Sequence, residues 1–318
     1  SESGMIASHR FPMYRSANGN LLPEYAHLHF SSPRGKYDLG IASPGGAGRN
    51  KTLGQDEFKR LELLTPPIEF QRLTINVINT WTRAINQVEA LLAAKEKVRK
   101  GLLQQLLVGK KRLAGHSSAW TPMCLGDAGT FSKGAGVSKS EAVPDGLPAV
   151  RYGELYTIHH VVIKEFQTRI NAQSARASRK IYRGDILIAG SGETPEEIGK
   201  AAAFLGDFEA YAGGDIVIFS PKKADPVFLS YLLNSAAVRR FIQSRAQGQS
   251  VVHLYRRDLE ELPLLLPKPV EQRQIAQILT AADREIAILK SQVGALQIQR
   301  RGLIQKLLSG RNKTKGHP

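Results

Sequence analysis

The chain has 318 residues, of which 42% are hydrophobic, so it is long and apolar enough for at least one ordinary core and is not an intrinsically disordered protein. Its formal net charge of +16 favours a polyanionic partner, nucleic acid before a membrane surface, although basic soluble proteins without such a partner exist. The lone Cys124 excludes an intrachain disulfide framework and any cysteine-based structural zinc site, and we expect it to be a small buried residue.

The sequence predicts a cytoplasmic protein that neither spans a membrane nor is exported. No run of about 18 apolar residues occurs, and residues 1–5 contain no apolar signal core. The use of a single cysteine also fits a reducing compartment.

Residues 1–66 are expected to be the closing part of a globular domain, because short motifs in this segment recur later in the chain. Residues 61–64 match residues 262–265, and Pro23 can be set against Pro226 if a small length difference is allowed. The segment would then be the C-terminal remnant of a domain whose beginning is missing.

A first long helix is predicted over residues 67–113. It follows Pro66 and Pro67 and ends near Gly109, which are typical helix boundaries. Over about 40 residues it would reach about 60 Å, too long to be buried in a compact domain of this size. Its apolar residues recur at alternating steps of four and three, as in a coiled-coil seam. The central seam positions are Ile78, Trp81, Ile85, Val88 and Leu92.

Residues 114–266 predict one complete mixed α/β domain of about 150 residues, a common size for a single core. Strand-like runs occur at residues 149–152, 185–189 and 215–219. One helix is expected over roughly residues 226–246, because apolar residues recur there at helical spacing.

A second long helix is predicted over residues 267–310, before a basic tail at residues 311–318. It repeats the first helix without a gap, and Gly101 and Gly302 fix the offset at 302 − 101 = 201 residues. Two such apolar stripes can bury each other if the helices pack antiparallel. The matching seam positions are Ile286, Leu289, Val293, Leu296 and Leu303.

Residues that depart from the seam pattern leave alternatives open. Lys95, Arg99 and Arg300 interrupt the seams, either as long side chains that reach solvent at the edge of the coil or as residues that set the register or face a partner. Apolar residues outside the seam, such as Leu91 and Ile288, widen the stripe, so a third or fourth helix from another subunit could bury them.

The most complete catalytic patterns in the chain each lack an essential feature. Gly192 and Gly199 resemble the glycines of a phosphate loop, but six residues rather than four separate them, and Ala201 replaces the magnesium-binding hydroxyl. His159 and His160 are adjacent, so they do not share one helical face, and no zinc-protease motif surrounds them. We therefore predict no catalytic residue and no metal site.

Several motifs resemble one known family. Residues 269–276 and 302–310, at the two ends of the second long helix, are similar to the spacer helix of specificity subunits from Type I restriction-modification systems. The first long helix is similar at residues 67–72 and 101–110. The middle domain resembles the target recognition domain of this family at residues 125–127, 130–134, 150–156, 184–187 and 247–254.

The resemblance implies an α+β fold, with one mixed α/β target recognition domain, two long antiparallel coiled-coil helices and an N-terminal partial recognition domain. The usual order in the family is recognition domain, helix, recognition domain, helix. We therefore expect a truncated or split subunit, in which self-association or a second half-subunit could replace the missing part.

The resemblance also implies a non-catalytic subunit that reads a bipartite site on double-stranded DNA and docks methyltransferase subunits, with restriction subunits joining through the complex. This chain would hold no cofactor, since S-adenosylmethionine, ATP and magnesium would bind the partner subunits. One alternative is a coiled-coil adaptor that does not read DNA. A weaker alternative is a DNA methyltransferase or nuclease with an unrecognised site.

Polar and basic loop residues of the middle domain are the candidates for reading DNA, since lysine and arginine hold phosphates and a few side chains touch base edges. Serine, threonine and glutamine in glycine-rich turns also act as caps, so each candidate has a structural alternative. The candidates are Ser132, Lys133, Lys139, Arg151, Tyr152, Glu154, Tyr156, Ser191, Glu193, Thr194, Lys200, Gln247, Gln249, Ser250 and His253.

Overall fold

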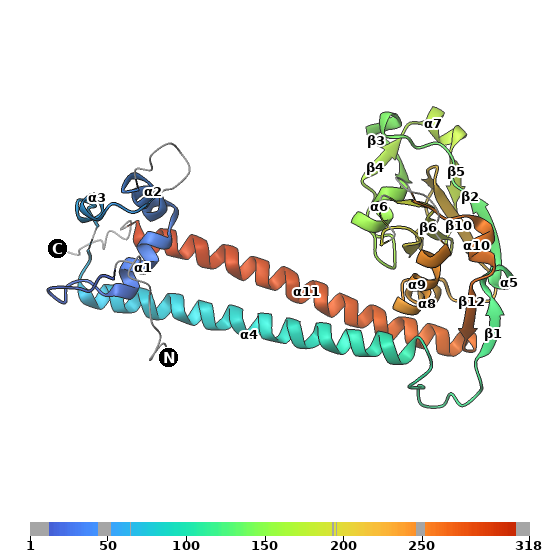
Figure 1. The fold of residues 1–318 in the computed structure, drawn as a ribbon, viewed down its shortest axis with the longest axis horizontal. Coiled ribbons are helices and arrows are strands. Elements are labelled where there is room, and N and C mark those ends of the chain that lie inside the picture. The colour runs from blue at the N-terminus through green and yellow to red at the C-terminus, as the bar shows by residue number, and fades with distance from the viewer. Residues whose placement is uncertain are drawn as a thin grey trace, which may run out of the picture. The chain divides into compact units, whose positions relative to one another are not determined.

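The chain forms two compact units, residues 1–94 with 286–318 and residues 95–285 (Figure 1). The computed structural model describes residues 13–43, 52–63, 65–192, 194, 196–245 and 252–309. The predicted α+β fold is confirmed. Of the two long helices, α4 (Ile68–Leu106) begins just after Pro66 and Pro67 and α11 (Pro269–Leu308) begins at a proline, and each contributes one part to both units. The basic tail at residues 311–318 lies outside the described residues.

In the first unit, α4 and α11 run antiparallel. Arg300 Nη1 donates to Thr82 Oγ1 at 3.1 Å, and Gln297 Nε2 donates to Glu89 Oε1 at 3.1 Å, so the partner number on α11 falls as the number on α4 rises. The middle of the predicted seam is buried in this unit. The seam residues with at most 8% of their surface exposed are Ile78, Ile85, Ile286 and Leu289.

The same antiparallel pairing occurs in the second unit, where ion pairs join the two helices. Lys95 Nζ lies 2.7 Å from Glu285 Oε1, and Arg99 Nε donates to Asp283 Oδ1. Lys95 and Arg99, the charged residues that interrupt the first seam, are thus ion-paired across it. These contacts suit a role in setting the register, while the side chains remain partly exposed at the edge of the coil. The Arg99–Asp283 contact also matches the Arg300–Thr82 contact of the first unit under the offset of 201 residues.

Three short helices complete the described part of the first unit: α1 (Pro23–Ser31), α2 (Pro33–Ile41) and α3 (Gln55–Lys59). Their order before α4 repeats the order before α11, where α8 (Pro226–Leu233), α9 (Ala236–Arg245) and α10 (Arg256–Glu260) precede the second long helix.

One side-chain amide makes the same contacts in both copies. Gln71 accepts from the backbone N–H of Leu22 at the start of α1 and donates to Pro66 O, both at 2.8 Å. Gln272 accepts from the backbone N–H of Asp225 at the start of α8, at 2.7 Å, and donates to Pro267 O at 2.8 Å. The duplication seen in the sequence is therefore also a duplication of local structure.

The second unit holds two four-stranded sheets and two two-stranded ladders. The sheet orders are β2-β10-β6-β8 and β4-β3-β9-β5, and the ladders are β1-β12 and β11-β7. Only β3 and β9 are parallel among the described pairs. The strands are β1 (Thr121–Cys124), β2 (Gly129–Lys133), β3 (Ala142–Val150), β4 (Thr168–Ile170), β5 (Arg179–Ile181), β6 (Ile186–Ala189), β7 (Ser191–Gly192), β8 (Ala201–Ala203), β9 (Ala210–Ala212), β10 (Ile216–Pro221), β11 (Val252–His253) and β12 (Pro263–Leu266).

The two four-stranded sheets share one apolar cluster. Leu187 and Ile218 from one sheet contact it together with Val150 and Ala212 from the other, and each is at most 1% exposed. The short helices of this unit are α5 (Leu125–Ala128), the 3₁₀ helix η1 (Lys139–Glu141), α6 (Tyr152–Thr157) and α7 (Ala172–Ala177). The shared cluster fixes the loops that follow β2, β3 and β6 relative to one another.

The helix expected over residues 226–246 is wrong in one respect, because two helices occupy it. Asn234 ends α8, and its amide donates to Ala201 O at 2.6 Å and to Ser230 O at 2.8 Å. A tertiary contact with β8 therefore interrupts a continuous apolar period. The strand expected to continue to Tyr152 is also shorter, since Tyr152 begins α6.

Cys124 corrects another expectation, because it is exposed rather than buried. It lies in β1, which pairs only with β12 and has one open edge. No helix among the described residues is long and apolar enough to cross a membrane.

The two equivalent glutamines generate a stability prediction. Replacing Gln272, which is 1% exposed, with leucine removes the partners of two backbone groups and should lower the free energy of unfolding by about 2 kcal/mol. Hydrogen exchange should rise at the start of α8 in Gln272→Leu and at the start of α1 in Gln71→Leu. Each variant is the control for the other. Faster exchange at the starts of both α1 and α8 in either single variant would contradict the idea that each glutamine fixes only its own helix start.

Candidate nucleic-acid interface

Two pockets lie side by side in the second unit. The larger, here called the Arg151 pocket, has a volume of about 600 Å³, and the smaller, here called the His253 pocket, about 340 Å³. Asp215 lines both, so the two pockets adjoin at this residue.

The Arg151 pocket is built at the end of β3, where the chain turns into α6. It holds five of the predicted DNA-reading residues in its wall: Lys139, Arg151, Tyr152, Glu154 and Tyr156. These residues come from one short sequence segment and the 3₁₀ helix η1. Four of the five are thus neighbours in the sequence as well as in the pocket.

A glycine-rich loop closes the opposite wall of this pocket. The N–H of Gly214 donates to Gly136 O at 2.9 Å, and the N–H of Gly134 donates to Ile216 O at 2.8 Å. A Cβ atom on Gly134 would lie 1.9 Å from Gly213 O, so only glycine allows the two backbone segments to approach this closely.

A buried carboxylate orients the cation of the Arg151 pocket. Arg151 Nε donates to Thr168 Oγ1 at 3.0 Å and lies 3.5 Å from Glu154 Oε1. Thr168 Oγ1 in turn donates to Glu154 Oε1. Glu154 is only 4% exposed, so it positions its neighbours rather than offering an accessible acceptor to DNA.

The His253 pocket joins the ends of β2, β6 and β11. It holds four predicted residues: Ser132, Lys133, Ser191 and His253. Ser191 Oγ and His253 Nδ1 are 3.0 Å apart, and Ser191 is buried, so this hydrogen bond fixes the imidazole ring against the sheet.

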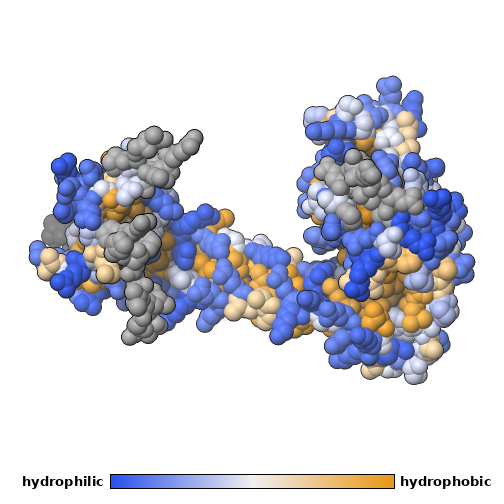
Figure 2. Space-filling view, viewed as in Figure 1, coloured by the Kyte–Doolittle hydropathy of each residue, from blue (hydrophilic) through white to orange (hydrophobic). Residues whose placement is uncertain are grey.

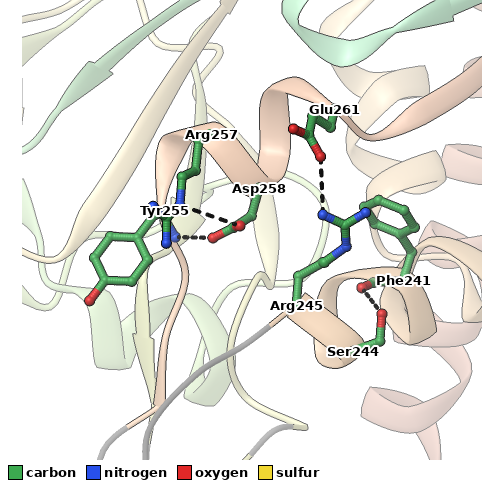
Figure 3. Close-up of polar contacts among 7 residues, drawn as sticks. All are labelled: Phe241, Ser244, Arg245, Tyr255, Arg257, Asp258 and Glu261. Atoms are coloured by element: carbon green, nitrogen blue, oxygen red, sulfur yellow. Dashed lines mark hydrogen bonds and ion pairs between the residues drawn. The ribbon is translucent and has the colours of Figure 1, made fainter.

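An exposed aromatic residue with adjacent arginines follows His253, and the sequence prediction missed it. Tyr255 is 49% exposed, Arg257 stacks over its ring at 5.4 Å, and Arg256 lines the His253 pocket. Figure 3 shows the Tyr255 ring projecting away from α10. The backbone N–H of Tyr255 donates to Asp258 Oδ2 at 3.2 Å. The run of one tyrosine and two arginines was a signal that could have found this site, since aromatic and basic neighbours are typical of nucleic-acid surfaces.

Two further predicted residues, Thr194 and Lys200, do not line either pocket. Thr194 donates its backbone N–H to Glu197 Oε2 at 3.2 Å. Lys200 is half-buried, and its pKa is lowered first by burial and then by the charge of Arg239. Four predicted residues lie outside the described residues: Glu193, Gln247, Gln249 and Ser250.

Comparison with known proteins gives a consistent family. A family model described as Type I restriction modification DNA specificity domain matches residues 117–296. The chain is 27% identical over 130 residues to the Type I restriction enzyme MjaVIII specificity subunit of Methanocaldococcus jannaschii, covering 41% of this chain and 29% of that protein. It is 20% identical over 286 residues to the MjaX specificity subunit of the same organism, covering 85% of this chain and 63% of that protein.

The chain thus spans less than two thirds of the length of both relatives. Among solved structures, the S subunit of a Type I restriction-modification system from M. genitalium has the same fold. The TM-score is 0.60 at 16% identity, over 91% of this chain and 73% of that chain.

The buried His159, next to the Arg151 pocket, generates a pH prediction. Burial is the main cause that lowers its pKa below the ordinary value of 6.5, against the opposing charge of Glu154. The unfolded chain therefore takes up a proton first as the pH falls, so this contribution to stability is complete above pH 6.5 and is lost below it. From pH 7.5 to 5.5, thermal melting should show a larger loss of stability in the wild type than in His159→Gln.

The adjacent and exposed His160 supplies a graded comparison, because its charge also lowers the pKa of His159; His160→Gln should reduce the loss of stability, but by less than His159→Gln. An equal fall in melting temperature for the wild type and His159→Gln would show that the fold does not lower the pKa of His159.

Proposed function

Because the chain belongs to the Type I restriction modification DNA specificity domain family, we propose that it is a specificity subunit whose second unit recognises a DNA sequence. The observation that carries this proposal is the pair of adjoining pockets. They bring together predicted DNA-reading residues from five separate segments, together with exposed cations.

The composition of this surface suits a division of labour on DNA. Lys133 and Lys139 are exposed and have no contact partner among the described side chains, so they are suited to phosphate oxygens. Arg151, Tyr152 and His253 lie within the pockets and are suited to base edges. The net charge of +16 would favour binding to DNA of any sequence, to which the pockets add selectivity.

The first unit is proposed to carry the closing part of a second recognition domain. Its helices α1, α2 and α3 repeat the order of α8, α9 and α10, and Gln71 repeats the contacts of Gln272. The site on DNA would then be bipartite.

The long helices are proposed to dock methyltransferase subunits. Figure 2 shows apolar patches at the surface of the helix pair, and Ile288 and Ile298 are 66% and 63% exposed. Buried seam residues such as Leu289 serve the pairing of the two helices instead. We place catalysis, and the binding of S-adenosylmethionine, ATP and magnesium, on the partner subunits, within the cytoplasm.

The DNA-reading proposal is tested by selection from random duplexes, followed by binding at several salt concentrations. We expect a sequence preference and a steep fall in affinity with salt. Lys133→Ala and Lys139→Ala should weaken binding to all sequences alike, and each should reduce the log–log salt slope by about 1. Lys164→Ala, at an exposed lysine that lines neither pocket, is the control. Binding without any sequence preference would favour the adaptor alternative.

The docking proposal is tested with charged substitutions on α11. The double variant Ile288→Asp and Ile298→Asp should bind a methyltransferase subunit about tenfold more weakly or worse, because each exposed apolar side chain would otherwise be buried in the complex. Gln292→Asp adds one negative charge, against two in the double variant, at an exposed polar position and should bind normally. Full-strength binding by the double variant, measured by calorimetry, would rule out this surface of the helix.

A further inference from the structure

We propose that Arg151 reads a guanine in the major groove, and that the buried Glu154 holds the arginine in its reading position through Thr168. This inference rests on the proposed function and names a specificity-determining residue and its positioning residues. No contact with the target base is assigned to Glu154 itself.

The position of Arg151 follows from the register of the sheet. Ala149 of β3 lies opposite Thr168 of β4, so the chain leaving β3 passes directly beside that threonine. Arg151 lies two residues further on, as the N-terminal cap of α6, with its backbone still extended. Its side chain therefore starts at a fixed point on the rim of the pocket.

The side chain is then held at its inner end only. Arg151 Nε donates to Thr168 Oγ1, and both Thr168 and Glu154 are at least nine-tenths buried. Among the residues that the structure describes, the two Nη atoms of Arg151 have no hydrogen-bond partner. The arginine side chain is 35% exposed, so its outer fork faces the pocket and solvent.

Guanine matches this fork better than the other bases. Its O6 and N7 atoms accept two parallel hydrogen bonds from one guanidinium, the most common specific contact between proteins and DNA. A guanidinium already fixed at Nε loses little conformational freedom on binding. The pocket, at about 600 Å³, has room for the edge of a base pair.

The buried carboxylate argues for a base over a phosphate. Glu154 Oε1 lies 3.5 Å from Arg151 Nε, so it already balances the arginine charge. A phosphate at the fork would be repelled by that negative charge, whereas the guanine edge is neutral. Lys133 and Lys139 are exposed and form no ion pair among the described residues, so they are better placed for phosphates.

The central variant is Arg151→Lys, which keeps the charge and removes the fork. Selection from random duplexes by the full chain should show a preference for guanine at one position in the wild type. The variant should lose about 10- to 100-fold of discrimination at that position alone, with the salt slope unchanged. Arg169→Lys is the matched control, since Arg169 lies in β4 beside Thr168 but donates to Gly146 O and lines neither pocket.

The positioning role is tested by a double-mutant cycle. Glu154→Gln and Thr168→Val should each weaken discrimination at the same position, and neither should weaken it further when combined with Arg151→Lys. Two substitutions are used because either one alone could impair folding, which the melting temperature reports. Loss of stability without loss of discrimination in both would overturn the positioning role.

Two results would overturn the reading role. If Arg151→Lys weakens binding to all sequences alike, or if Arg151→Ala lowers the salt slope by about 1 with base preferences intact, Arg151 holds a phosphate. A wild-type chain that binds DNA without any sequence preference would overturn the proposed function and this inference together. Intact preference that ignores Arg151 would overturn the inference alone.

Discussion

A helix of 40 residues with an apolar stripe needs a second helix to cover it, and the antiparallel pairing of α4 with α11 is the constraint on which the rest of the fold depends. Because the second helix runs in the opposite direction, the chain between them must return to where it left. Residues 121–266 of the second unit do this by pairing their first strand with their last, with Thr121 opposite Leu266. These residues are thus an insertion whose two ends are held together.

Polar contacts fix the register of the two long helices, which the apolar stripe alone does not determine. Apolar seams tolerate a slip in register, whereas a buried charge does not. Arg112 makes a two-pronged contact with Glu271, both distances being 2.8 Å, and Glu271 is 1% exposed. Gln272, the next residue, joins α11 to the start of α8. The beginning of α11 is therefore fixed within the second unit by two adjacent side chains, since Glu271 binds Arg112 and Gln272 binds the start of α8.

The periodic apolar residues and the duplicated segment predicted the two long helices, because both patterns depend on local structure within each helix. The continuous apolar period at residues 226–246 predicted one helix where there are two. The Asn234 amide donates to Ala201 in β8, a contact that the spacing of apolar residues does not indicate. The candidate site divides in the same way. The wall from Arg151 to Tyr156 is one sequence segment and was predictable. The role of Asp215 in joining two pockets depends on strand order and on a left-handed backbone, with φ of 60°, for which the sequence offers no signal.

Within the second unit, a chain of contacts among three residues joins both long helices to α8. Tyr231 on α8 donates to Asp283 Oδ2 on α11 at 2.7 Å, and Asp283 Oδ1 accepts from Arg99 on α4. Since α8 also packs against β8 of the sheet β2-β10-β6-β8, whose strands β2 and β10 line the His253 pocket, the same junction holds both helices against that sheet. A slip of one helix along the other at this point would therefore break contacts that also support the pocket.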